Sequence, residues 1–398
     1  MRRVFKIIYQ SALYIFALTG LGFIGVYVAL KFQWTDVPGG IDARSQLFAA
    51  TAEATQLTAA DVQPTLEFVA TPNQLSITDL NQRIADAILY QSQLQEVKQA
   101  KQTVLCQIQV LSDDAGYDTA NIWAAYQATG SSVVLDKMTF SVEPYLSSDY
   151  TAASSTCLNP DVNLDETTVA EYVQQHTGGA SVYAWQTAEE WPNLAAAVTK
   201  DADLINRVAT ETGVPARLIA SALLVEQLRL FHTQREYYEQ YFAPLKILAS
   251  ATKFAWGVMS IKENTAKQIE QHLTDPTSSY YLGVDNEHKL DFSTADTATE
   301  RYNRLTNDDD HYYAYLYGAL YLKQLMAQWQ AAGYDIQQRP EIILTLFNIG
   351  FEHSEPKADP AVGGSTLSIG GHSYTFGGLG YEIYYSGILQ SEFALPTE

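Results

Sequence analysis

Cysteine is almost absent from this sequence of 398 residues, which contains only Cys106 and Cys157. Two thiolates cannot form the all-cysteine sites that hold structural zinc, and no histidine pair at helical ligand spacing supplements them. We therefore expect no metal site and no cofactor. A disulfide between the two cysteines would close about 50 residues and stabilise the fold by roughly 4 kcal/mol in the chain-entropy model. The alternative is two buried thiols that never meet.

Basic residues are also scarce, since 24 lysines and arginines face 45 acidic residues and give a formal net charge of −21. Four of the 24 lie in or beside an N-terminal apolar run, which leaves 20 against 45 and a charge of −25 for the remainder. Such a surface repels phosphate backbones and anionic lipid headgroups. We expect no nucleic-acid partner, and a neutral or cationic polymer is a better fit.

Charged residues are missing altogether from Ile7 to Leu30, an apolar run long enough for a helix to span a bilayer, which takes roughly 20 residues. Positive charge before the run and Phe32 and Trp34 after it are typical flanks of a membrane span. We predict a cytoplasmic tail at residues 1–6 and a single-pass anchor at 7–31 in the cytoplasmic (inner) membrane, with the C-terminal part periplasmic or extracellular. The alternative is a cleaved signal peptide, but its apolar core would be only about 7 to 15 residues long.

Two regions of different pattern follow the anchor. A break at Val37–Gly40 indicates a short linker. Residues 40–111 are rich in alanine and glutamine and have helical periodicity, which predicts a helical stalk. Residues 112–198 contain β-branched stretches at Ser132–Leu135 and Met138–Val142, which predict a small mixed α+β region.

The C-terminal half, residues 199–395, is strongly helical in pattern. We expect helices there at Ala202–Thr212, Pro215–Phe231, Thr265–His272, Tyr312–Ala332 and Pro340–Phe347. One shorter helix is expected before this half, at Thr167–His176. Two alternating runs around Gly370-Gly371 predict a β-hairpin in a glycine-rich tail. The fold class is therefore mainly α, with an N-terminal transmembrane helix, a stalk, a small mixed region and a C-terminal helical domain.

One acidic residue in the second of these C-terminal helices stands out. Ile219, Ala222, Leu223 and Glu226 recur at i, i+3, i+4 and i+7, so Glu226 shares the apolar stripe. Burial disfavours the charged form of a carboxyl, which is what a general acid working near neutral pH requires. The alternative is a solvated ion pair between Glu226 and Arg229, one turn further on, which would contribute little.

Four segments in a fixed order resemble the motifs of lytic transglycosylases, the lysozyme-like enzymes that cut peptidoglycan. The segment Gly257–Ala266 (GVMSIKENTA) is similar to the family's Gly-Leu-Met-Gln-Ile-x-Pro-x-Thr-Ala. Tyr317–Leu325 (YGALYLKQL) resembles its Gly-Ala-x-Tyr-Leu helix, and Leu346–Gly350 (LFNIG) its Ala-Tyr-Asn-x-Gly. Glu226 stands where the family has its Glu-Ser. The resemblance covers about residues 203 to 352 and implies a lysozyme-like domain at 199–395.

By this resemblance Glu226 is the single catalytic acid. The substrate-binding residues that it implies are Gln227, Gly257, Met259, Ser260, Phe347 and Asn348. The sequence departs from the family pattern with Gln227 in place of serine, Ser260 in place of glutamine and Glu263 in place of proline. These departures leave the fold better supported than the activity.

The function that follows is that of a membrane-anchored lytic transglycosylase, which would cleave between N-acetylmuramic acid and N-acetylglucosamine and leave 1,6-anhydro ends. An ordinary lysozyme uses two carboxylates, and the only further acid that the motifs offer is Glu263. The expected partners are peptidoglycan glycan strands and the membrane, reached through the N-terminal helix. The alternative, from another class, is a catalytically weak lysozyme-like module that binds peptidoglycan and scaffolds an envelope or secretion assembly.

Overall fold

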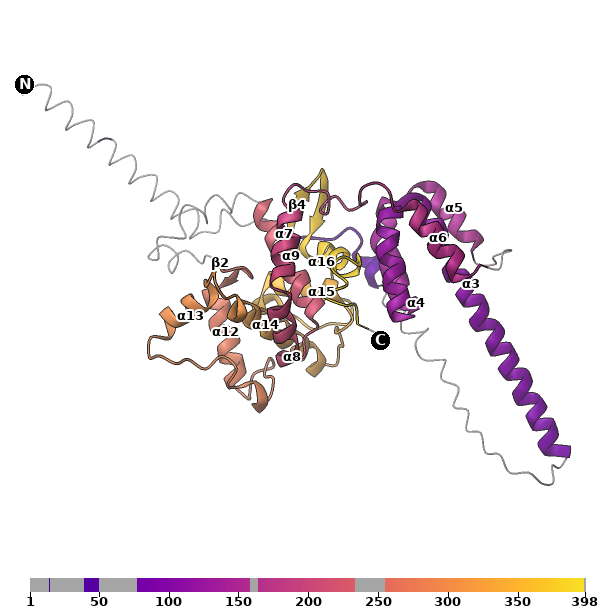
Figure 1. The fold of residues 1–398 in the computed structure, drawn as a ribbon. Helices are drawn as coiled ribbons and strands as arrows, with labels where there is room; N and C mark the ends of the chain where they lie inside the picture. The colour runs from indigo at the N-terminus through magenta and orange to yellow at the C-terminus, as the bar shows by residue number, and fades with distance from the viewer. Residues whose placement is uncertain (1–13, 15–38, 50–76, 158–163, 233–254, 397–398) are drawn as a thin grey trace, which may run out of the picture. The chain divides into compact units, whose positions relative to one another are not determined.

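The structure is a computed structural model that describes Tyr14 and residues 39–49, 77–157, 164–232 and 255–396 (Figure 1). The predicted cytoplasmic tail and membrane anchor, residues 1–31, lie outside the described residues apart from Tyr14. Among the described residues, no helix combines the length and the apolar character needed to cross a bilayer.

The chain divides into two compact units, each of which is mainly helical. The first comprises the chain up to Ser45 together with Glu189–Gly380, and the second comprises Gln46–Ala188 together with Tyr381–Glu398. Both units are therefore discontinuous in sequence. These boundaries differ from the expected succession of stalk, mixed region and C-terminal domain.

The second unit is built on one long helix, α3, which is bent at Ala115. Its elements are α3 (Ile77–Thr129), α4 (Ser132–Val142), η1 (Glu143–Tyr145), α5 (Ser148–Thr156) and α6 (Glu166–His176). The core contains fully buried side chains of α3, among them Leu105, Ile108 and Ile122. The helical prediction for the second half of 40–111 and the short helix at Thr167–His176 are confirmed.

The two cysteines form a disulfide, so the alternative of two separate thiols is wrong. Cys106 lies on α3 and Cys157 directly after α5, with their Cα atoms 5.5 Å apart. Cys157 is fully buried. The bridge therefore fixes the end of α5 against α3 inside the second unit.

The prediction of strands between residues 132 and 142 is wrong, because this segment is the helix α4. Ser131 caps the helix, its hydroxyl accepting a hydrogen bond from the backbone N–H of Val134 at 3.2 Å. Val133, Val134 and Met138 are buried. A β-branched side chain prefers strands only where a pleated surface is available, and here helix packing overrides that preference. No strand occurs among the described residues of 112–198, so this region is not mixed.

The buried helix α14 (Tyr312–Ala331) lies at the centre of the first unit. The helices α8, α9, α12 and α15 pack against it (Figure 1). Its helices are α7 (Trp191–Lys200), α8 (Ala202–Thr212), α9 (Ala216–Phe231), α12 (Glu263–Thr274), α13 (Thr297–Leu305), α14 and α15 (Pro340–Ile349), with short turns η2 (Val284–Asn286) and η3 (Phe351–His353). The helix α16 (Phe376–Tyr385) begins in this unit, and its last five residues are assigned to the second unit. The predicted helices of this half are confirmed. The helices α7, α13 and α16 are not among the predicted ones.

Two small antiparallel sheets complete the first unit. One is the hairpin of β2 (Ala255–Trp256) and β3 (Ile261–Lys262). The other has the order β1-β4-β5, with β1 (Gly39–Ile41), β4 (Gly363–Ile369) and β5 (His372–Thr375). The predicted hairpin is confirmed, because β4 and β5 pair up to Ile369↔His372 around Gly370 and Gly371, both at positive φ.

The strand β1 corrects the prediction of a linker and a stalk at this point of the chain. Gly40 pairs with Gly364, and a side chain at Gly363 would come within 2.3 Å of the Gly40 carbonyl oxygen. Asp42 then accepts a hydrogen bond from the hydroxyl of Thr375 at 2.8 Å. Residues 39–41 therefore add an edge strand to the sheet of the first unit. Their own sequence does not indicate that they pair with β4, more than 300 positions later.

Candidate active site

The helix α9 carries the predicted catalytic acid into the interior of the first unit. Gly213 ends the preceding helix with φ +75°, and Pro215 occupies the N-cap of α9 with φ −54°. Nearly every residue from Arg217 to Arg229 is buried, which is typical of a helix surrounded by other elements. Glu226 is 4% exposed. The apolar stripe is thus part of a helix that is buried on all sides.

The carboxylate of Glu226 binds the guanidinium of Arg229. Nε of Arg229 donates to one oxygen of Glu226 at 3.1 Å, and Nη2 donates to the other oxygen. Both side chains are 6% exposed. The pairing was foreseen as an alternative, but as a solvated pair of little consequence, whereas this pair is buried and takes up both carboxylate oxygens.

A tight turn between β2 and β3 contains three of the predicted substrate-binding residues. Gly257 has φ +66°, and a side chain there would come within 1.8 Å of the carbonyl oxygen of Leu305. Glycine is required for both reasons. Ser260, at φ +48°, closes the turn by donating its N–H to the Gly257 carbonyl oxygen at 3.0 Å.

This turn is fixed to α9 directly beside the acid. The amide Nε2 of Gln227 donates to the backbone carbonyl oxygen of Val258 at 2.5 Å. Gln227, which replaces the serine of the resembled motif, therefore connects α9 to the β2–β3 turn. A serine hydroxyl is shorter by two bonds and could not span the same separation without a shift of the backbone.

Met259 connects the same turn to α14. It is 1% exposed, and a side chain at Gly318 would come within 2.6 Å of its terminal methyl group. The small residue in the Tyr317–Leu325 motif thus provides room for the methionine of the Gly257–Ala266 motif. Three of the four resembled segments are packed on one another by these contacts.

The fourth segment, at the end of α15, has a different environment from the one expected. The side-chain oxygen of Asn348 accepts hydrogen bonds from the N–H of Ser365 at 2.7 Å and from its hydroxyl at 3.0 Å. Phe347 is 8% exposed and its ring lies 5.1 Å from that of Tyr321. Asn348 therefore holds the β4 strand through its acceptor, and Phe347 is a core residue.

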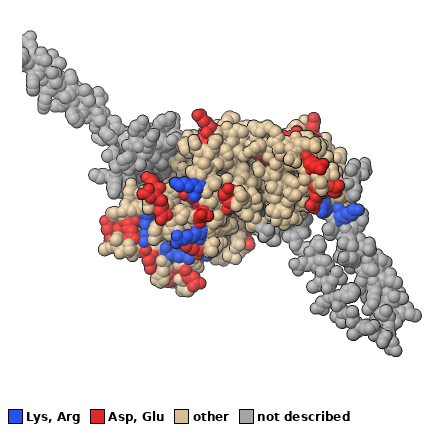
Figure 2. All heavy atoms as spheres, in the orientation of Figure 1, with Lys and Arg blue, Asp and Glu red and all other residues tan. Residues whose placement is uncertain are grey.

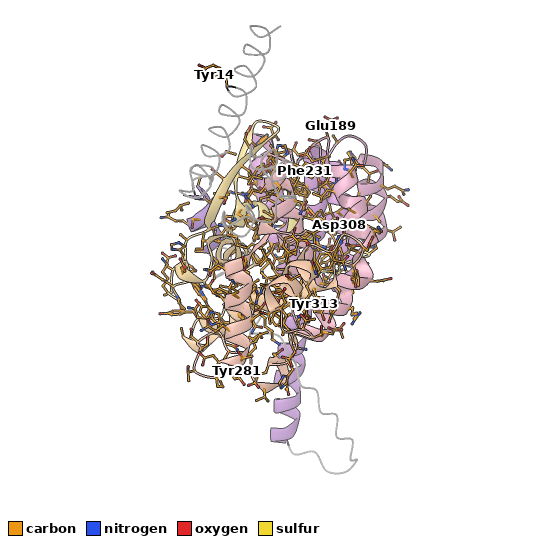
Figure 3. All side chains as sticks on the ribbon, turned by 90° about the vertical axis from the view of Figure 1, so that its left-hand side faces the viewer. Tyr14, Glu189, Phe231, Tyr281, Asp308 and Tyr313 are labelled. Carbon is orange, nitrogen blue, oxygen red and sulfur yellow. A yellow bond between two sulfur atoms is a disulfide. The ribbon has the colours of Figure 1, made fainter. Side chains whose placement is uncertain are left out.

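The end of α9 has a second close contact with an acidic side chain, which the sequence pattern does not indicate. His232 caps the helix, and its Nε2 contacts a carboxylate oxygen of Glu190, just before α7. Phe231, labelled in Figure 3, is 46% exposed at the same end of the helix. The two partners are 42 positions apart, and no short-range pattern links them.

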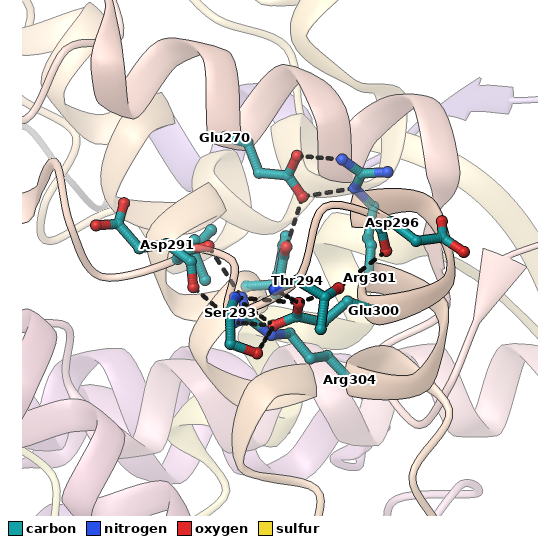
Figure 4. Close-up of polar contacts among 10 residues, drawn as sticks. Glu270, Asp291, Ser293, Thr294, Asp296, Glu300, Arg301 and Arg304 are labelled. Carbon is teal, nitrogen blue, oxygen red and sulfur yellow. Dashed lines mark hydrogen bonds and ion pairs between the residues drawn. The ribbon is translucent and has the colours of Figure 1, made fainter.

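Figure 4 shows a larger network of polar contacts in the first unit. Arg301 of α13 donates to both oxygens of Glu270 of α12 at 2.6 Å, and the hydroxyl of Tyr317 on α14 donates to the same carboxylate at 2.5 Å. Burial, together with this bond, raises the pKa of Tyr317 above its ordinary value. The network cross-links three helices.

The neighbouring carboxylate of Glu300 is held by the loop that precedes α13. The backbone N–H of Ser293 is the main reason why the pKa of Glu300 is lowered to about 2, and the hydroxyl and N–H of Thr294 add to it. Arg304 donates to the same carboxylate at 2.6 Å. Glu300 therefore organises a loop and has no free oxygen for catalysis.

The remaining acid of the resembled motifs, Glu263, forms an ion pair with Lys267 at 2.7 Å in the first turn of α12.

Within the part of the chain that the structure describes, no group of three or more His, Cys, Asp or Glu side chains could hold a metal ion. On the face drawn in Figure 2, acidic side chains are dispersed and basic ones lie among them. The site thus offers one buried carboxylate, one guanidinium and neutral polar groups.

No protein-family model, no curated protein and no solved structure matches this chain.

Proposed function

We propose that this chain is a membrane-anchored peptidoglycan lytic transglycosylase in which Glu226 is the single acid and base. The observation that carries the proposal is the burial of the Glu226 carboxylate on α9, beside Gln227 and the turn that this glutamine holds. The packing of Met259 on Gly318 supports it further, because three of the four resembled segments are thereby packed on one another. A buried carboxyl positioned beside a turn of the backbone is a suitable proton donor.

The reaction needs one proton-transfer group. Glu226, once protonated, donates to the glycosidic oxygen that leaves N-acetylmuramic acid. The resulting carboxylate then accepts the proton of the muramyl 6-hydroxyl, whose oxygen closes a 1,6-anhydro ring. Hydrolysis by two carboxylates fits less well, because Glu263 is bound to Lys267 in α12.

The substrate and the location follow from the sequence. Glycan strands of peptidoglycan lie outside the cytoplasmic membrane, where the predicted anchor at residues 7–31 would hold the rest of the chain. The disulfide between Cys106 and Cys157 fits that location, since disulfides persist outside the cytoplasm. An acidic surface is compatible with an uncharged sugar backbone and repels nucleic acid.

The test is digestion of purified peptidoglycan by the full chain in detergent, followed by mass spectrometry of the soluble fragments. Anhydro-muramyl ends are the expected product. Reducing muramyl ends would instead indicate hydrolysis and a second acid. Fragments should disappear in the Glu226→Gln variant. They should also disappear in Glu226→Gln/Arg229→Gln, which removes both charges of the pair and so avoids any misfolding caused by a guanidinium that has lost its carboxylate.

A second candidate function is a peptidoglycan-binding scaffold of an envelope or secretion assembly. It is favoured by one observation, namely that Arg229 takes up both oxygens of Glu226. A carboxylate that never leaves this pair cannot transfer a proton. Co-sedimentation of the wild-type chain with peptidoglycan, without any release of fragments, would support the scaffold and contradict the enzyme.

A further inference from the structure

Tyr321 of α14 carries a hydroxyl group that makes no hydrogen bond within the part of the chain that the structure describes. The residue is 3% exposed, and its ring lies 4.6 Å from the ring of Phe351 and 5.1 Å from that of Phe347. A polar group buried without a partner costs free energy, so phenylalanine would suit these aromatic surroundings better. The described fold gives no reason for the hydroxyl, whereas a bound ligand would.

This hydroxyl faces a space beside Gly350. Its oxygen is not one of the fully buried polar atoms without a partner, so the small accessible part of Tyr321 includes that oxygen. Gly350 has φ +95°, and a side-chain carbon built on it would meet only one described atom within 4 Å apart from its chain neighbours, the hydroxyl oxygen of Tyr321 at 3.9 Å. This is an ordinary van der Waals distance. A carbon-sized atom of a ligand therefore has room there, in contact with the hydroxyl.

The position of Tyr321 connects it to the candidate active site. It lies three residues after Gly318 on α14, so the two residues share a face of the helix. Met259 of the β2–β3 turn packs at Gly318, and Gln227 holds the same turn next to Glu226. Tyr321 thus lies within one helical turn of the contact that joins the resembled segments.

A second hydrogen-bond donor lies two residues before Gly350. The side-chain oxygen of Asn348 accepts a hydrogen bond from the backbone N–H of Ser365, which identifies the other end of the amide as its nitrogen. That nitrogen bonds to no group among the described residues, and Asn348 is partly exposed. Tyr321 and Asn348 therefore both offer donors, which suit a ligand that supplies an acceptor oxygen.

We propose that Tyr321 recognises the N-acetyl groups of the glycan by donating its hydroxyl hydrogen to the acetamido carbonyl oxygen. This inference rests on the proposed function for the kind of glycan and adds a residue that selects it. The acetamido methyl group then packs against the rings of Phe347 and Phe351, which lie beside that of Tyr321. Burial raises the pKa of Tyr321 above its ordinary value, so the phenol remains a donor.

The test compares two neutral hexasaccharides that differ only in this group. One is the β-1,4-linked hexamer of N-acetylglucosamine, and the other is the same hexamer of glucose, which has a hydroxyl in place of each acetamido group. Isothermal titration calorimetry measures their binding to the full chain in detergent. The wild type should prefer the acetylated hexamer. Tyr321→Phe should bind that hexamer about threefold to tenfold more weakly, as expected for one hydrogen bond, and should bind the glucose hexamer as the wild type does.

Three results of this titration would overturn the proposal. Equal weakening for both hexamers would mean that the hydroxyl acts through the shape of the site and not through an acetamido group. An unchanged affinity of Tyr321→Phe for the acetylated hexamer would mean that the hydroxyl does not contact the sugar. A wild-type chain without preference for the acetylated hexamer would show that no N-acetyl group is recognised.

Thermal unfolding without glycan separates recognition from a structural role. The matched variant is Tyr280→Phe, because the ring of Tyr280 also packs on Phe351 and its hydroxyl donates to the Phe351 carbonyl oxygen at 3.1 Å. Tyr280→Phe should lower the unfolding midpoint and keep the preference for N-acetyl groups. Tyr321→Phe should leave the midpoint unchanged or raise it. A lower midpoint in Tyr321→Phe would mean that its hydroxyl is bonded inside the fold, for instance to a buried water, and would overturn the proposal.

Digestion of peptidoglycan separates failure of this inference from failure of the proposed function. Binding of the acetylated hexamer that depends on Tyr321, without any release of anhydro-muramyl fragments, would keep the recognition and remove the enzyme. Release of those fragments by Tyr321→Phe at the wild-type rate, measured at low substrate concentration, would keep the enzyme and remove the recognition.

Discussion

Two glutamates of the first unit each bind an arginine through both carboxylate oxygens, yet the two pairs connect different things. Glu270 of α12 binds Arg301 of α13 and accepts a third hydrogen bond from Tyr317 of α14. Glu226 binds Arg229 within α9. The pair that bridges helices contributes to the arrangement of the fold, whereas the bond within α9 joins two residues that the helix already holds close together.

If the proposed function holds, this difference separates a structural role from a catalytic one. The Glu270 pair lies at a junction where three helices need a common polar centre, and Tyr317 completes it. The bond between Glu226 and Arg229 also carries a desolvation cost, but it joins two residues of one helix. Under the proposed function, Glu226 is retained for its chemistry and Glu270 for the junction between helices.

The largest expected effect is the loss of glycan cleavage in Glu226→Gln. Removal of a single proton-transfer group should lower the rate by at least roughly 10² to 10⁴, measured as fragments released per folded protein. The matched variant Glu270→Gln should cleave at the wild-type rate per folded protein, although less of it will be folded. Equal losses of specific activity in both variants would contradict the distinction between the two pairs.

The next effect concerns stability at the bridging pair. Arg301→Met leaves the Glu270 carboxylate without its cation and should lower the free energy of unfolding by about 3 to 5 kcal/mol. Urea unfolding followed by tryptophan fluorescence measures the change. A change below about 1 kcal/mol would mean that the bridge contributes no more than an exposed pair does.

A smaller effect is expected when each pair is replaced by apolar residues. Glu226→Leu/Arg229→Met should leave stability unchanged or raise it by roughly 1 to 4 kcal/mol, as is common when a buried pair is replaced by well-packed side chains. Glu270→Leu/Arg301→Met should instead destabilise the fold, because the Tyr317 hydroxyl loses its acceptor, at about 1 to 3 kcal/mol. If the unfolding midpoints of both double variants changed in the same direction, the distinction between the two pairs would be contradicted.

The smallest effect is the pH dependence at Glu300, whose pKa is lowered to about 2 chiefly by the backbone N–H of Ser293. A lowered pKa means that the folded state holds the carboxylate more favourably, so the stabilisation is complete above the ordinary value of 4.5 and is lost as the pH falls towards 2. The unfolding midpoint of Glu300→Gln should lie below that of the wild type at pH 7. The two midpoints should converge near pH 2, and a constant gap would contradict the assignment.

Local signals predicted the fold well where a helix depends on its own sequence. The helix α8 begins and ends at the predicted residues, Ala202 and Thr212, because its periodicity is regular and Gly213 adopts the left-handed conformation that stops it. The segment Ser132–Val142 was misread because its β-branched residues favour strands in isolation, and packing in the second unit decides otherwise.

Distant partners explain most of what the sequence did not reveal about the site. The burial of Glu226 and its spacing from Arg229 could both be predicted from the helical period, but the depth of Arg229 could not, because it depends on every element around α9. The acceptor of Asn348 binds Ser365, 17 positions later. The bond between Gln227 and Val258 spans 31 positions. Neither bond has a signature within a short window.

The pairing of β1 with β4 also has a consequence in time. A chain is synthesised from its N-terminus at about 5 to 20 residues per second, and Asp42 binds Thr375, which lies 333 positions later. Gly39–Ile41 therefore waits on the order of tens of seconds for its neighbouring strand. Both cysteines of the second unit are synthesised long before that moment, so their disulfide can form while the sheet of the first unit still lacks its partner.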